Sequence, residues 1–237
     1  MLNISTQVKN ITGNIYYVAD KLLKFCRFFF INLEVGMKNM NILRANKLSQ
    51  IESILLCIVL TVLAGISINL GGLLVLFLPI QNLGSWQLIV PAIFFIIGFI
   101  IIPRILTEKT IGFTSYIYQT MNFYLFITYI IIVFIVFTIW PTNLESVIQS
   151  FIVSTCEEYL FRGIIFAILI NKFNKLQTFI IGSLIFALLL HLNGNFFDNL
   201  LIKFPSGILL YIIADKLGLQ ESILFHWVHN IIVSKLG

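Results

Sequence analysis

Charged residues are scarce in this chain. Only 11% of its 237 residues are Asp, Glu, Lys or Arg, against about 25% in an ordinary soluble domain, and 59% are hydrophobic. None of these four residue types occurs between Ser53 and Pro103, a stretch long enough for two membrane crossings of about 20 residues and a short turn. The composition therefore excludes an ordinary soluble domain and predicts an integral membrane protein.

The apolar runs also lack the strict alternation of polar and apolar residues that marks a membrane strand. Since backbone groups in lipid must be hydrogen-bonded within their own segment, such runs predict helices. We expect an all-α, polytopic membrane protein with about seven to eight transmembrane helices. The seven predicted spans are residues 54–80, 88–102, 122–140, 147–170, 176–192, 200–214 and 222–233.

A change in composition near Gln50 divides the chain. Residues 1–50 hold seven basic and two acidic residues with phenylalanines between them, a mixture typical of an interfacial helix. We predict that 1–50 is an N-terminal region that lies at the interface or forms a weak first span, and that 51–237 is the multi-span domain. Basic residues cluster in alternate loops, which predicts a cell-membrane protein with a cytoplasmic N-terminus, although Lys203 is an exception.

Several classes of site are missing. The chain has no Gly-rich phosphate loop, and its cysteines, Cys26, Cys57 and Cys156, have no metal-ligand spacing. Cys156 is not expected to be a nucleophile, because a thiol beside two carboxyl groups in lipid stays protonated. The net charge of +5 comes largely from residues that flank the spans, so we expect the lipid bilayer, and no nucleic acid, as a partner.

Three charges interrupt the fourth predicted span: Glu157, Glu158 and Arg162. Each central charge costs roughly 2.5 to 3.5 kcal/mol in a membrane helix, so this group needs pairing, a polar cavity or a function. Glu158 and Arg162 are four residues apart with the acid first, the favourable order for a helical ion pair. Glu157 points about 100° away and is free to act as a general base. The alternative is that both glutamates only hold helices together.

The remaining polar candidates lie in the last third of the chain. His226 and Asn230 are four residues apart, so their side chains share one helix face and can hold a developing oxyanion. His191 ends the apolar run of the fifth span, and we expect it to have an active role. His229 projects about 60° to the side of His226 and is expected to be a packing or interfacial residue.

These residues, in this order, resemble the CPBP family of CAAX proteases and bacteriocin-processing enzymes, formerly called Abi proteins. The family elements are a double glutamate with an arginine four residues after the second, a Phe-x-x-x-His element, and a His-x-x-x-Asn or His-x-x-x-Asp element. The first and third match fully. In the second, Ala187 stands four residues before His191, and Phe186 is one position too early. The resemblance covers about residues 149–236.

The resemblance implies an intramembrane endopeptidase similar to the Ras-converting CAAX endopeptidase, with transmembrane helices around a polar cavity. Its substrate would be a hydrophobic or membrane-tethered peptide, in CAAX-type or bacteriocin and leader processing. If the residue roles of the family apply at the matching positions of this chain, Glu157 and His191 would activate the attacking water. His226 and Asn230 would hold the oxyanion, and Glu158 and Arg162 would support the site.

Three alternatives stay open. Zinc could bind to Glu157, His191 and His226 with an open fourth position, but the chain lacks a His-Glu-x-x-His helix and Asn230 is a poor zinc ligand, so we favour no metal cofactor. A non-catalytic immunity or scaffold protein would act by binding a partner. A proton-coupled transporter is disfavoured because no paired broken helices occur in matching halves.

Straight spans raise one difficulty. They place His191 near the outer end of its helix, Glu157 near the middle of the membrane and His226 closer to the cytoplasmic side. A shared site therefore requires tilted helices, irregular helix ends or different span limits.

Overall fold

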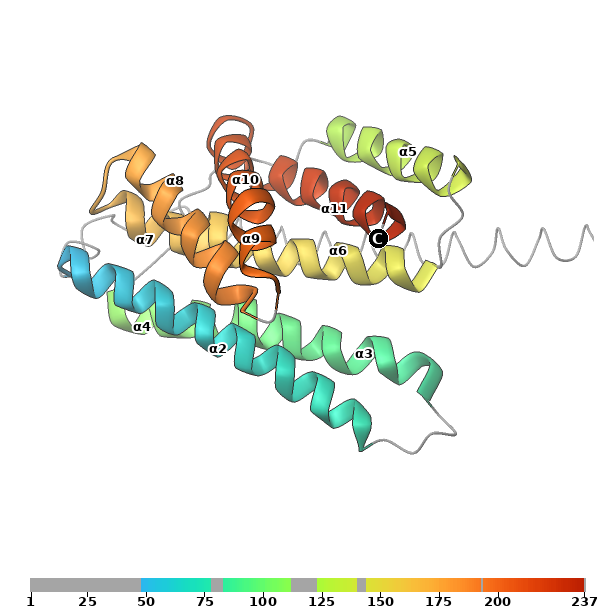
Figure 1. Cartoon of the computed structure of the whole chain (residues 1–237), viewed down its shortest axis with the longest axis horizontal. Helices are drawn as coiled ribbons and strands as arrows, with labels where there is room; N and C mark the ends of the chain where they lie inside the picture. Colours follow the sequence, from blue (N-terminus) through green and yellow to red (C-terminus); the bar gives the residue numbers. More distant parts are fainter. Residues whose placement is uncertain (1–47, 78–82, 112–122, 140–143, 193, 237) are drawn as a thin grey trace, which may run out of the picture. The chain divides into compact units, whose positions relative to one another are not determined.

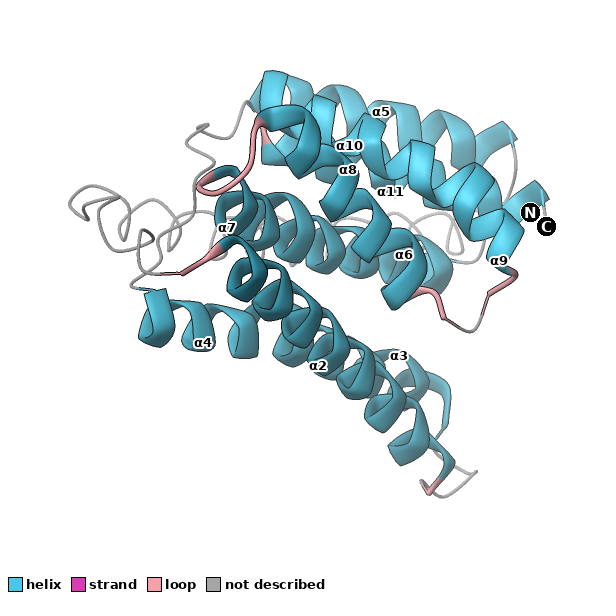
Figure 2. Cartoon of the chain, turned by 60° about the vertical axis from the view of Figure 1, so that its left-hand side comes forward, coloured by secondary structure: helices cyan, strands magenta, loops and turns pink. Residues whose placement is uncertain are grey.

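The computed structural model describes residues 48–77, 83–111, 123–139, 144–192 and 194–236. Within these ranges the regular structure is helical and contains no strand (Figure 2), so the predicted all-α class is confirmed. Residues 1–47 lie outside the described part of the chain. The predicted character of the N-terminal region, the boundary near Gln50 and the eighth span therefore stay predictions.

The described ranges contain seven continuous helices, and each predicted span overlaps one of them, although residues 78–80, 122 and 140 of these spans lie outside the described part. Four of these helices contain a π-helical segment, labelled η. In chain order they are α2 (Gln50–Leu76); α3, η3 and α4 (Leu83–Ile96, Ile97–Ile101, Ile102–Ile111); α5 (Phe123–Ile139); α6, η4 and α7 (Leu144–Glu158, Tyr159–Ile165, Phe166–Ile170); α8 and η5 (Lys175–Leu184, Ile185–Leu190); α9, η6 and α10 (Phe196–Asp198, Asn199–Lys203, Phe204–Lys216); and α11 (Leu219–Leu236).

Among the residues that the structure describes, three stretches are long and apolar enough to cross a bilayer: Gln50–Leu76, Gln87–Ile111 and Phe196–Lys216. A chain with several such helices is an integral membrane protein, as the composition predicted. The predicted crossing by the other helices, and the orientation of the N-terminus, are parts of the proposal below.

Local signals explain several helix ends. Ser49 and Glu52 form a capping box at the start of α2, and Asn174 and Gln177 form one at the start of α8. In each box the cap side chain accepts from a backbone N–H while the third residue accepts from the cap N–H. Gly218 has a φ of 122° and separates α10 from α11, a conformation that glycine adopts without strain. After this turn, α11 packs against α10 and α6.

Helix packing brings distant parts of the sequence together. Helix α2 packs on α3, α6 lies alongside α11, and α10 contacts both α8 and α11 (Figure 1). At Gly182 on α8, an added methyl group would overlap the Tyr211 hydroxyl of α10, so the small residue permits this close approach. Tyr211 is thereby placed to donate a 2.9 Å hydrogen bond to the Phe161 carbonyl oxygen in η4.

Candidate active site

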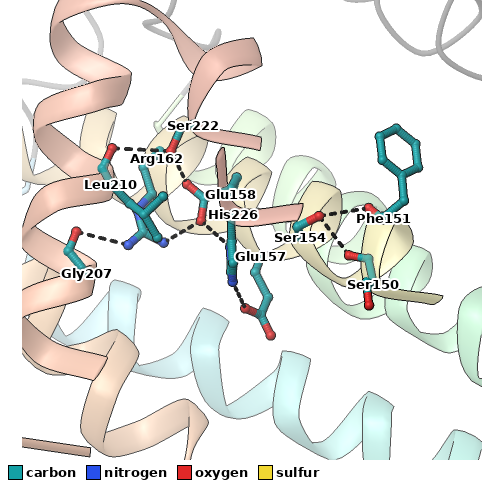
Figure 3. A network of polar contacts seen from close by, with 10 residues as sticks. All are labelled: Ser150, Phe151, Ser154, Glu157, Glu158, Arg162, Gly207, Leu210, Ser222 and His226. Carbon is teal, nitrogen blue, oxygen red and sulfur yellow. Dashed lines mark hydrogen bonds and ion pairs between the residues drawn. The ribbon is translucent and has the colours of Figure 1, made fainter. Parts of the chain in front are cut away.

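Glu158 is the centre of a buried polar network (Figure 3). Its carboxylate accepts a hydrogen bond from Arg162 Nη1 at 2.9 Å and lies 2.8 Å from His226 Nδ1. The hydroxyl of Ser222 donates to its other oxygen. The predicted ion pair between Glu158 and Arg162 is therefore present, and the same carboxylate also joins α6 to α11.

Arg162 is fully buried, and both of its terminal guanidinium nitrogens have hydrogen-bond partners. Its Nη2 donates to the Gly207 carbonyl oxygen of α10 at 3.1 Å. Its guanidinium carbon lies 4.7 Å from the ring centre of Phe186 and 4.8 Å from that of Tyr211. Both distances are within the range of cation–π attraction. Ion pair, hydrogen bond and aromatic faces together make this charge tolerable inside an apolar helix packing.

Glu157 occupies a different position from its neighbour. It is buried, and its Oε2 lies 3.8 Å from Nε2 of His226, which is too long for a direct hydrogen bond. One imidazole thus faces both glutamates, with Nδ1 on Glu158 and Nε2 toward Glu157 (Figure 3). Because Nδ1–H donates to the Glu158 carboxylate, the ring orientation is set and Nε2 is left for proton transfer or substrate.

This contact bears on the difficulty that straight spans raised. Glu157 and His226 were placed at different levels of the membrane, yet their side chains are 3.8 Å apart. The difficulty therefore does not apply to this pair, since span limits from hydropathy vary by several residues and each residue moves a side chain by about 1.5 Å along a helix. Helices α6 and α11 lie side by side and bring the two residues level.

His191 ends the helix formed by α8 and η5. Its ring centre lies 5.1 Å from that of Phe186, and Phe186 in turn lies 6.4 Å from the ring of His226. The His191 carbonyl oxygen accepts 2.6 Å and 3.0 Å hydrogen bonds from the Asn199 side chain and the Gly194 N–H. Phe186 therefore contacts both histidines, and Asn199 holds the turn that follows His191.

The π-helical segment η5 explains the departure from the family spacing. Residues Ile185–Leu190 follow the i to i+5 hydrogen-bonding pattern, in which residues five apart take the relation that four-residue spacing has in an α-helix. Phe186, five residues before His191, therefore reaches the ring of that histidine. The backbone of η5 thus brings Phe186 against His191 although the spacing differs by one residue from the family pattern.

Asn230 and His229 lie further along α11. Asn230 is half-buried, and no hydrogen bond found in the described residues joins it to Glu157, His191 or His226. Its oxyanion role, like the catalytic roles of the other candidates, stays a prediction. His229 is exposed, with its ring centre 6.5 Å from that of His226.

A metal ion would need several ligand side chains placed close together. In the part of the chain that the structure describes, no group of three or more His, Cys, Asp or Glu side chains is placed to hold a metal ion. The expectation of a metal-free site, and its zinc alternative on Glu157, His191 and His226, both remain predictions for experiment.

Ser222 is a site residue that sequence reasoning missed. It is fully buried, and its hydroxyl contacts both the Glu158 carboxylate and the Leu210 carbonyl oxygen. The only signal in the sequence is its position four residues before His226, which puts both on one helix face. Serine is too common in membrane helices for that spacing to be distinctive.

Part of the chain matches a known protein family. Residues 129–232 match the family model described as "Type II CAAX prenyl endopeptidase Rce1-like", and this range contains Glu157, Glu158, Arg162, His191, His226 and Asn230. The chain therefore contains a domain of this protease family, which confirms the resemblance seen in the sequence. No curated protein and no solved structure gave a match.

Replacement of Ser222 by alanine tests the network around Glu158. We expect Ser222→Ala to lower the free energy of unfolding by about 1–3 kcal/mol, because a buried carboxylate oxygen loses its donor. Thermal and denaturant unfolding in detergent would measure the change. Ser206→Ala is the matched control, since the Ser206 hydroxyl bonds the Ile202 carbonyl of its own helix and its loss should cost at most about 0.5 kcal/mol. Equal effects would contradict the role given to Ser222.

Proposed function

We propose that this chain is an intramembrane endopeptidase that hydrolyses a peptide bond in a hydrophobic or membrane-tethered peptide, by CAAX-type or bacteriocin and leader processing. The observation that carries the proposal is the pair formed by Glu157 and His226 in a domain of a protease family. A carboxyl group outside the ion pair stands beside an imidazole whose orientation is set by Glu158. In this proposal the seven or eight helices surround a polar cavity in the cell membrane, with the N-terminus in the cytoplasm.

The proposed chemistry begins with a water molecule beside Glu157. Glu157 takes a proton from the water while His191 orients it, and the oxygen attacks the carbonyl carbon. His226, as an imidazolium that carries a hydrogen on Nδ1 and another on Nε2, donates from Nε2 to the oxyanion that forms, and Asn230 donates a second hydrogen bond. Glu157 then returns the proton to the leaving nitrogen as the carbon–nitrogen bond breaks. The products are a new carboxyl group and a new amine.

In this scheme the buried network has a positioning role. Arg162 and Ser222 hold the Glu158 carboxylate, and that carboxylate holds Nδ1 of His226. A fixed ring is important because catalytic groups must be in place before charge develops. Phe186 limits the space between His191 and His226. The polar groups that touch substrate would then be Glu157, His191, His226 and Asn230.

Cleavage by reconstituted protein tests this function directly. Proteoliposomes that contain the full chain would be incubated with N-palmitoylated decapeptides of randomised sequence, and mass spectrometry would detect new peptide ends. We expect chain-dependent cleavage at a restricted set of bonds. A folded protein that cleaves none of them, yet binds some of the peptides above the level seen in protein-free liposomes, would support the alternative of a non-catalytic immunity or scaffold protein.

Metal removal distinguishes a metal-free reaction from a zinc-dependent one. We propose a metal-free reaction and expect cleavage to be unchanged by EDTA or 1,10-phenanthroline, because water activation is assigned to Glu157 itself. Metal analysis of the purified protein would accompany the assay. Loss of cleavage on chelation, restored by one equivalent of zinc, would contradict the proposal and favour zinc bound to Glu157, His191 and His226.

A further inference from the structure

Lys203 is a cation that neither membrane orientation nor the site chemistry explains. It lies in η6, inside the apolar stretch Phe196–Lys216 that is long enough to cross a bilayer. Its side chain is half-buried. Among the residues that the structure describes, none of the ion pairs includes Lys203. A charge in such a segment is costly, so its presence points to a partner or a function.

The position of η6 places Lys203 next to the candidate active site. Segment η6 packs on η5, the segment that leads to His191. Asn199, at the start of η6, reaches the His191 carbonyl oxygen with its side-chain nitrogen at 2.6 Å. Lys203 is four residues further along the same π-helical segment, slightly less than one full turn, so its side chain leaves the helix on a similar side. The two residues therefore face the same end of the site.

Electrostatics agrees with this placement. The Lys203 ammonium is near enough for its charge to act on Glu157, His191 and Asp198, of which Asp198 is exposed to solvent. Glu158 is already balanced by Arg162, whereas Glu157 is assigned to water activation. A substrate that enters the site and displaces water would leave the ammonium without hydration. The ammonium is then stabilised best by an anionic group that the substrate itself brings.

We propose that Lys203 is a specificity-determining residue that binds a carboxylate of the peptide substrate. This inference rests on the proposed peptidase function. The carboxylate can come from the free C-terminus or from an acidic side chain near the scissile bond, since a lysine ammonium is a compact point charge with three donors and accepts either geometry. Peptides without such a group lose a charge-assisted contact and leave Lys203 unpaired.

Three sets of peptides distinguish the sources. All are N-palmitoylated decapeptides of randomised sequence in proteoliposomes with the full chain. The first set has a free C-terminus and no acidic residue, the second has a C-terminal amide and no acidic residue, and the third has a C-terminal amide and one aspartate. We expect the first or the third set to be cleaved about tenfold faster than the second, the size of one hydrogen bond to a charged group.

Variants of Lys203 show whether this residue causes the preference. Lys203→Met keeps most of the side-chain length and should reduce the ratio of rates to about one, whereas Lys203→Arg should keep it. Lys203→Gln is a second neutral variant in case the methionine variant is poorly folded. Lys216→Met removes an exposed lysine at the end of α10 and should leave the preference as it is.

The outcomes separate this inference from the proposed function. Equal cleavage of the three sets by the unmodified chain would overturn the role of Lys203 while the peptidase function stands. A preference that survives in both neutral variants would also overturn it. If no set is cleaved, the peptidase function fails and the inference fails with it.

Discussion

Glu157→Gln is expected to lower the rate of peptide cleavage by about 10²- to 10⁴-fold, the range that a positioned general base contributes. Glutamine has nearly the shape of glutamate but cannot take a proton from water. Glu157 is not part of the ion pair between Glu158 and Arg162, and its nearest charged partner is His226 at 3.8 Å. Catalysis should therefore be lost while the fold is kept.

The same change on an exposed glutamate is the control. Glu108→Gln alters a solvent-exposed carboxyl group on α4, so its cleavage rate should stay close to that of the unmodified chain. Initial rates with the palmitoylated peptides and thermal unfolding of both variants would be measured together. Undiminished cleavage by Glu157→Gln would remove Glu157 from the mechanism.

Arg162→Leu is expected to lower the free energy of unfolding by about 3–5 kcal/mol, as loss of one partner from a buried ion pair does. The change removes the 2.9 Å contact to Glu158 and the hydrogen bond to the Gly207 carbonyl oxygen. The Glu158 carboxylate would remain fully buried with one fewer donor. His226 would also lose its fixed orientation, so cleavage should fall as well.

An exposed ion pair with the same length provides the comparison. Lys175 Nζ lies 2.9 Å from the Asp215 carboxylate, and the lysine side chain is 59% exposed. Lys175→Ala should cost only about 0–1 kcal/mol, because water and salt screen such a pair. Denaturant unfolding in one detergent would measure both variants. Losses of similar size would contradict the buried, coupled character assigned to the network around Glu158.

Features that depend on local order could be predicted from the sequence. The absence of charge between Ser53 and Pro103 indicated helices that cross the membrane, and the structure has α2 and α3 there. The ion pair between Glu158 and Arg162 followed from their spacing, because residues four apart meet on one helix. Both predictions concern neighbours along a single segment.

Contacts between helices were harder to predict. Nothing in the sequence shows that His226 bonds Glu158 through Nδ1 and faces Glu157 through Nε2, because this depends on how α6 and α11 are rotated and aligned. Ser222 was missed for the same reason. The π-helical segment before His191 has no sequence signature either, since residues 185–190 are all apolar whichever helix they form.

The most direct test of the central claim is the fate of water oxygen during cleavage. The reaction would be run in H₂¹⁸O with the unmodified chain and with Glu157→Gln, and the products analysed by mass spectrometry. Hydrolysis at this site predicts one ¹⁸O atom in the new C-terminal carboxyl group for the unmodified chain, and almost no product for Glu157→Gln. The absence of product from a folded, unmodified chain, or equal labelled product from both proteins, would contradict the account.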